Sequence, residues 1–96
     1  LEKTAAAYGS TLEEWTRTRV PLQWALSHAN LGNTLWAIGE FRRDATLLQM
    51  AANEITAALE VFRSQAQDQY EATAQDNLRA LQSDIRRLSR TAEMRR

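Results

Sequence analysis

The stretch that decides the fold reads ANLGNTLW over residues 29–36. Its apolar residues Leu31 and Leu35, continued by Ile38, recur at helical spacings of four and three. The chain around it is rich in Ala, Leu, Gln, Glu and Arg, which are strong helix formers. Val and Ile are scarce, so a β-sheet has little to build with. Because neither Gly nor Pro follows Gly39, the sequence predicts an all-α fold.

Capping and helix-breaking residues divide this chain into about four expected helices. A first helix is expected over residues 1–17 and a break over 18–20, because the residue before a proline disfavours helix. Pro21 suits the first turn of a second helix, since its missing N–H costs nothing there. We expect that helix to end near Ile38, with Gly39 as its C-terminal cap.

The second half of the chain leaves one boundary open. Asp44 is a good N-cap residue for a third helix. The polar residues 65–70 favour a break before a fourth helix over 70–92, but one continuous helix from about 45 to 92 is the alternative. The last stretch has heptad spacing, which suits either a packed bundle helix or a coiled-coil seam. Its apolar residues are Ala74, Leu78, Leu81, Ile85, Leu88 and Ala92.

An internal repeat is the most informative pattern. A shift of 47 residues aligns the first part of the chain with the second. The aligned pairs include Leu1 with Leu48, Ala5 with Ala52, Tyr8 with Ile55, Leu12 with Leu59, Trp15 with Phe62, Asn30 with Asn77, and Leu31 with Leu78. A fixed period of this size is typical of arrays in which stacked helix pairs share a continuous core.

Residues 29–36, followed by Gly-Glu-Phe at 39–41, resemble the first helix and turn of a tetratricopeptide repeat. In that family the Gly of the Leu-Gly pair, here Gly32, lets the neighbouring helix approach closely. Ala51, Ile55 and Ala58 resemble the small and bulky packing positions of the repeat's second helix. The resemblance therefore implies antiparallel helix pairs arranged in a superhelix.

The resemblance covers residues 1–96 as a single domain. It implies the second helix of a preceding repeat at 1–17, one full repeat at 21–64 and a capping helix at 70–92. The period of 47 is longer than the family's usual 34 residues. A longer-period subgroup in bacterial proteins carries a link similar to RVPLQWA at residues 19–25.

Two stripes on the second helix separate the expected core from the expected binding surface. Trp24, His28, Leu31, Leu35 and Ile38 form the stripe that we assign to the core, against the third helix. In the family, the first helix of each pair lines a concave groove that holds a peptide or a partner helix. The resemblance places Leu26, Ala29, Asn33, Trp36 and Ala37 in that groove.

Trp36 is the anchor that we expect in the groove, because a large, rigid aromatic side chain offers much contact area. Asn33 could hold a peptide backbone, because its amide both donates and accepts hydrogen bonds. The alternative is that Trp36 packs on a neighbouring helix within the domain.

The composition argues against several other classes of function. Twelve basic and twelve acidic residues leave no net charge, which disfavours nucleic-acid binding. There is no Cys, and His28 is the single His without metal-ligand spacing, so we expect no metal, cofactor or catalytic residue. No apolar run is long enough for a membrane span, and we expect a cytoplasmic location. Because the chain starts at Leu1 without Met, we read it as a piece of a longer protein.

These observations predict a non-catalytic protein-interaction module that binds a peptide or a helix of another protein on its concave face. The alternative is a structural segment that joins copies of its own chain into a homo-oligomer. For that alternative the candidate contact surfaces are Trp15, Trp36 and the heptad-spaced last helix.

Overall fold

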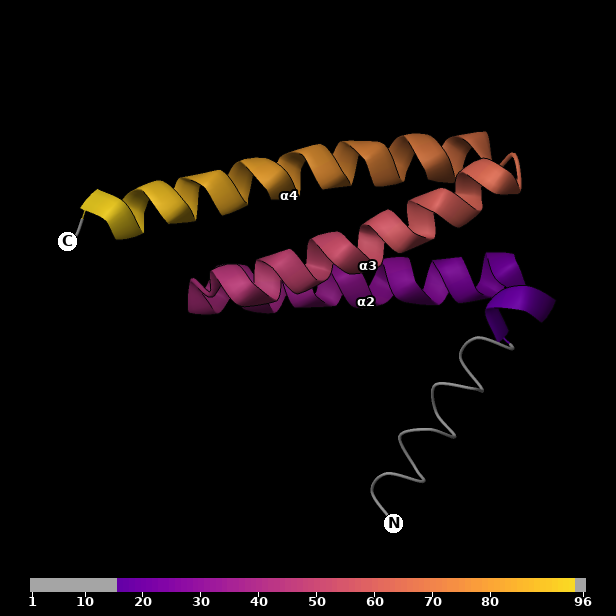
Figure 1. Cartoon of the computed structure of the whole chain (residues 1–96), viewed down its shortest axis with the longest axis horizontal. Coiled ribbons are helices and arrows are strands. Elements are labelled where there is room, and N and C mark those ends of the chain that lie inside the picture. The colour runs from indigo at the N-terminus through magenta and orange to yellow at the C-terminus, as the bar shows by residue number, and fades with distance from the viewer. Residues whose placement is uncertain (1–15, 95–96) are drawn as a thin grey trace, which may run out of the picture.

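The computed structural model describes residues 16–94, and side chains up to Thr91, as helices joined by short connections (Figure 1). After a helical stretch at 16–19, the chain forms α2 (Pro21–Arg42), α3 (Ala45–Ser64) and α4 (Asp68–Met94). The described part contains no β-strand, so the expected all-α fold is confirmed. The expected first helix falls mostly on residues 1–15, outside the described residues.

Helix α2 begins where the sequence predicts but continues further than expected. Pro21 occupies its first turn. The helix ends at Arg42 and not near Ile38, because Arg43 takes the left-handed conformation with φ 53° and ψ 47°. Gly39 is therefore not a cap but a buried residue inside the helix, and that prediction is wrong.

The connections on both sides of α3, residues 43–44 and 65–67, are short and contain no glycine. The carboxylate of Asp44 accepts hydrogen bonds from the backbone N–H groups of Thr46 (2.9 Å) and Leu47 (3.2 Å), so the expected N-cap is confirmed. At the other end, Ala66 takes a φ of 56°. The N–H of Gln67 bonds to the carbonyl of Phe62 at 2.9 Å, which closes a Schellman-type helix end. A break at 65–67 is thus present, and the alternative of one continuous helix is wrong.

The three helices alternate in direction and pack in pairs. Figure 1 shows α3 running back along α2, and α4 running back along α3. The principal contacts join α2 to α3 and α3 to α4. Most of the buried core comes from α3, the middle helix: Leu48, Ala51, Ala52, Ile55, Ala58, Leu59, Val61 and Phe62.

Small residues form the α2 side of the α2–α3 contact. Ala25, Gly32 and Gly39 are buried at intervals of seven residues. A Cβ atom on Gly32 would lie 2.7 Å from Ile55 Cγ1 and 3.1 Å from the carbonyl oxygen of Ala51. These separations are shorter than van der Waals contact, so the expected close approach of a helix at Gly32 is confirmed.

The stripe assigned to the core from the sequence lies largely elsewhere. Trp24 is buried and His28 and Leu35 are half-buried, but Leu31 is 45% exposed and Ile38 is 39% exposed. The prediction is wrong for Leu31 and Ile38. The reason is that α3 approaches α2 along its small residues, and this rotates the larger side chains of the stripe away from the contact.

The heptad-spaced residues of α4 up to Leu88 pack inside the domain, and Ala92 lies outside the residues whose side chains the structure describes. Leu81 is fully buried and Ala74 nearly so, while Leu78, Ile85 and Leu88 are half-buried against the same core. The pattern therefore suits a bundle helix, in which Ala74 and Leu81 are closed to further contacts. A Glu at Leu81 would bury a charge, so it would damage the domain itself.

Candidate partner-binding groove

A cavity of about 170 Å³ opens between α2 and α4, with α3 beneath it. Its base is formed by Ile55 and Phe62, both nearly fully buried. Its two walls come from parallel helices, which are brought together because each packs on α3. The wall residues are Leu26, Ala29, Asn30 and Asn33 of α2, and Tyr70, Thr73, Ala74 and Asn77 of α4.

The chemistry of this groove is neutral. Its base and inner walls are apolar, and the rings of Phe62 and Tyr70 stack with centroids 5.3 Å apart. Asn30, Asn33 and Asn77 provide amides that donate and accept hydrogen bonds. Among residues 16–94, no Asp, Glu, Lys or Arg lines it. Such a surface suits an uncharged peptide segment, with apolar side chains inside and backbone groups at the amides.

The 47-residue period of the sequence is also the spatial register between α2 and α4. Trp36 contacts Asp84, 48 positions later, and Glu40 contacts Arg87, 47 positions later. Asn30 and Asn77, again 47 apart, line the same cavity. A residue of α2 therefore lies beside its repeat equivalent in α4, as expected when units of one period stack side by side.

The structure places three of the five expected groove residues at the cavity and two outside it. Leu26, Ala29 and Asn33 line the cavity. Trp36 lies beyond it, half-buried against the core, and its indole N–H donates to Asp84 Oδ2 at 2.9 Å. This is the alternative that we considered for Trp36, packing on a neighbouring helix. Ala37 is exposed and does not line the cavity.

Sequence reasoning did not identify the α4 wall of the groove. Tyr70, Thr73 and Asn77 reach the cavity although they lie far from Asn33 along the chain. The recurrence of Asn30 at Asn77 was a signal that could have found this wall, because equivalent residues in stacked units face the same way. Which residues share a cavity still depended on how α3 separates the two helices.

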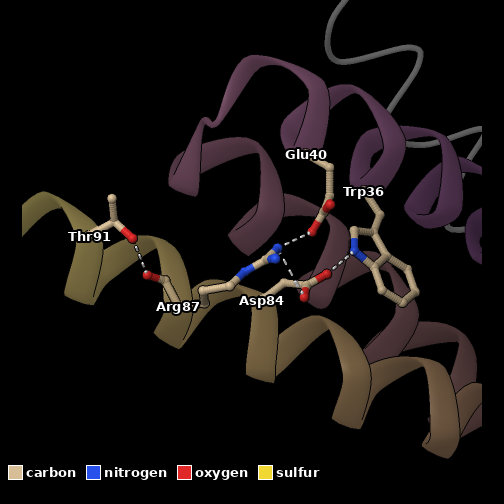
Figure 2. A network of polar contacts seen from close by, with 5 residues as sticks. All are labelled: Trp36, Glu40, Asp84, Arg87 and Thr91. Carbon is tan, nitrogen blue, oxygen red and sulfur yellow. Dashed lines mark hydrogen bonds and ion pairs between the residues drawn. The ribbon is translucent and has the colours of Figure 1, made fainter.

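A polar cluster next to the groove holds the C-terminal part of α2 against α4 (Figure 2). The Arg87 Nη2 group donates to Glu40 at 2.9 Å and to Asp84 at 3.3 Å. Asp84 also accepts the indole N–H of Trp36. We call Trp36, Glu40, Asp84 and Arg87 the polar latch. Because it crosses from α2 to α4, it fixes the separation of the two groove walls at that end.

The two carboxyl groups of the polar latch share a hydrogen bond, which separates their pKa values. This bond raises the pKa of Glu40 above its ordinary 4.5, and desolvation and the nearby charge of Asp84 act in the same direction. The same bond lowers the pKa of Asp84 below its ordinary 3.8, helped by the Trp36 N–H and by Arg87. As the pH falls, Glu40 is therefore protonated before Asp84.

The second cavity in this region, about 270 Å³, lies beside the polar latch and is lined by Glu40, Arg43, Arg87, Leu88 and Thr91. Within the latch, Arg87 is already paired with Glu40 and Asp84. The charged groups that line this cavity are one carboxyl group and two guanidinium groups, and the Arg43 guanidinium is the one that lies outside the latch.

The single histidine has packing contacts. The Nδ1 atom of His28 hydrogen-bonds with the Glu54 carboxylate, and its ring lies 4.1 Å from the Trp24 ring, centroid to centroid. Among the described residues, no group of three or more His, Asp and Glu side chains could hold a metal ion. Here His28 links α2 to α3 within the domain.

Comparison of the chain with protein-family models, with curated proteins and with solved structures found no match. Within residues 16–94, no helix combines the length and apolarity that crossing a membrane requires.

Proposed function

We propose that this chain is a non-catalytic protein-interaction module that binds a segment of another protein in the groove between α2 and α4. The observation that carries the proposal is the groove itself, which has an apolar base at Ile55 and Phe62 and amide groups on both walls. An extended peptide could place a side chain on the base and its backbone against Asn33 and Asn77.

The arrangement of the three helices supports the same function. The α2–α3 contact is tightly packed at Gly32 and Gly39, and the polar latch ties α2 to α4. The walls are therefore held in place before a partner arrives, which reduces the entropy lost on binding. The groove has a neutral lining, so apolar contact and backbone hydrogen bonds would provide most of the affinity.

Selection from a peptide library displayed on phage, followed by binding measurements on the selected peptides, tests this proposal. We expect apolar, uncharged sequences that bind with micromolar Kd and little salt dependence. Asn33→Arg introduces a long charged side chain at the groove and should weaken binding at least about tenfold, which corresponds to about 1.4 kcal/mol. The matched control is Ala37→Arg, an equally exposed change on α2 outside the cavity, which should leave Kd unchanged.

Equal effects of the two substitutions would contradict the proposal, since the binding site would then not be the groove. Selected peptides that are acidic and lose affinity in salt would contradict it as well. Both variants change exposed residues of α2, so their thermal unfolding should match that of the parent chain.

A further inference from the structure

The cavity of about 270 Å³ beside the polar latch is separate from the groove. Glu40 and Arg43 line it on the side of α2, and Arg87, Leu88 and Thr91 line it on the side of α4. None of these five residues lines the groove. We call this space the arginine cavity. Since a water molecule takes about 30 Å³, the space holds about nine waters, or one small organic molecule of similar size.

Arg43 brings an unpaired positive charge to the arginine cavity. It is the residue at which α2 ends, and its side chain is exposed. Among the residues whose side chains the structure describes, none forms a hydrogen bond or ion pair with the Arg43 guanidinium. The carboxylate of the next residue, Asp44, is occupied by two backbone N–H groups at the start of α3. The five N–H donors of the Arg43 guanidinium are therefore open to a ligand.

The segments around the arginine cavity are basic, although the whole chain has no net charge. Residues 40–44 and 84–91 contain five Arg and three acidic residues, which is an excess of two positive charges. Arg42, Arg86 and Arg90 are exposed and do not line the cavity. Positive charges gathered at one end of a molecule attract anions to that end.

One carboxyl group in the arginine cavity competes with an entering anion. Arg87 donates to Glu40 at 2.9 Å and to Asp84 at 3.3 Å (Figure 2). The hydrogen bond between the two carboxyl groups raises the pKa of Glu40, so Glu40 takes up a proton at a higher pH than an ordinary Glu does. Once Glu40 is neutral, Arg87 balances Asp84, and Arg43 has no opposite charge in the cavity. The Thr91 hydroxyl donates to the backbone carbonyl of Arg87 at 3.0 Å, which leaves the guanidinium groups as the donors.

We propose that the arginine cavity binds a carboxylate that carries a short aliphatic group, with Arg43 as its main hydrogen-bond donor. The planar guanidinium matches a carboxylate through two parallel N–H···O bonds. One negative charge suits the one unpaired charge of Arg43, whereas a dianion such as phosphate would place an excess negative charge beside Glu40 and Asp84. Leu88, which is half-buried, provides apolar contact for the aliphatic group.

Titration of the full chain with 4-methylpentanoate, followed by NMR of the backbone amides, tests the proposal. At about pH 7 and about 0.15 M salt we expect a Kd on the order of 1 mM, with shifts at Arg43, Leu88 and Thr91. The matched ligand 4-methylpentanamide has the same shape without the charge and should not bind. N-acetylleucine presents a similar group at the end of a peptide, and the tighter of the two acids tells whether a free acid or a peptide C-terminus is the better ligand.

Two substitutions should change the affinity for 4-methylpentanoate in opposite directions. Arg43→Gln removes the unpaired guanidinium and should weaken binding at least about fivefold. Glu40→Gln removes the competing carboxylate and should strengthen binding about threefold at about pH 7. The parent chain should also bind more tightly as the pH falls through the raised pKa of Glu40, and Glu40→Gln should lose this dependence. Arg42→Gln is the matched control: it removes the same charge from an adjacent exposed residue outside the cavity and should change Kd by less than about twofold.

Three outcomes would overturn the proposal. Equal losses of affinity in Arg43→Gln and Arg42→Gln would show only a general attraction of anions to this end of the molecule. Equal binding of the acid and its amide would show that the carboxylate is not recognised. Tighter binding of inorganic phosphate than of either acid would show a site for a dianion. The three variants change exposed residues, so melting curves check that each is folded. Because the groove and the arginine cavity share no lining residue, the two proposals can fail separately.

Discussion

The two sides of α2 on which other helices lie differ in how closely those helices approach. Towards α3, α2 offers Ala25, Gly32 and Gly39, and the two helices pack without room for another Cβ at either glycine. Towards α4, it offers larger side chains, and there the helices enclose a cavity and meet through the polar latch. Small residues therefore let α2 and α3 pack closely, whereas larger side chains keep α2 and α4 apart and leave a cavity between them.

Substitution of Gly32 by Ala should have the largest effect on the free energy of unfolding, because it acts at the closely packed α2–α3 contact. At Gly32 a Cβ would press on the backbone carbonyl of Ala51 and on Ile55 Cγ1, which cannot move freely. Overpacking of about 1–3 kcal/mol should exceed the gain of up to about 1 kcal/mol in helix propensity, so Gly32→Ala should be destabilising.

Gly39→Ala is the matched control. Its nearest neighbours are side-chain atoms, Leu48 Cδ2 at 2.8 Å with Leu47 Cβ and Leu48 Cγ at 3.2 Å, and no backbone atom is among them. Side chains shift more easily than backbone, so the loss of stability should be smaller. Urea unfolding of both variants measures the difference. A Gly32→Ala variant more stable than the parent would show that the α2–α3 contact is not closed at this point.

Removing the hydrogen bond between α2 and α4 should have a smaller effect. Trp36→Phe keeps an aromatic ring, smaller than the indole, but lacks the N–H that donates to Asp84. A double-mutant cycle with Asp84→Ala should give a coupling free energy of about 1 kcal/mol, the usual net contribution of such a bond. Chemical denaturation of the four proteins provides the values. A coupling close to zero would mean that the bond contributes nothing to holding α4 beside α2.

The pH dependence of the polar latch should give the smallest effect. Because folding raises the pKa of Glu40, protonation of Glu40 stabilises the folded state. This contribution is complete below pH 4.5 and is lost as the pH rises through the raised value. Glu40→Gln keeps a neutral donor at every pH. Its melting temperature relative to that of the parent should therefore rise between about pH 4 and pH 7, by only a few degrees because the site is partly exposed.

The ionisation of Asp84 changes the stability of the fold with pH in the opposite direction. Its pKa is lowered, so its contribution is present above pH 3.8 and is lost as the pH falls through the lower value. A Glu40→Gln/Asp84→Asn variant is the control. The melting temperature of Glu40→Gln relative to this control should stay constant between about pH 4 and pH 7 and should fall only as the pH drops through the lowered pKa of Asp84. A parent chain that becomes more stable from pH 4 to pH 7, relative to Glu40→Gln, would contradict the assigned direction.

The sequence alone determined the local features of this protein. Composition predicted the helices, while Pro21 and Asp44 fixed where α2 and α3 begin, because these effects act within a single turn. The repeat also predicted that α2 and α4 lie side by side, and the family resemblance of the Leu-Gly pair implied the close approach at Gly32. Each of these depends on residue type and spacing, which the chain carries before it folds.

Only the tertiary structure decided which side of α2 faces α3. Leu31 and Ile38 were good core candidates by hydrophobicity, yet they are exposed, because close packing favours the side with Ala25, Gly32 and Gly39. The same rotation directs Trp36 to Asp84 and leaves Asn33 at the cavity. Helical periodicity identifies apolar stripes, but the choice among them depends on how the surfaces of two helices fit together, and that fit exists only once both have formed.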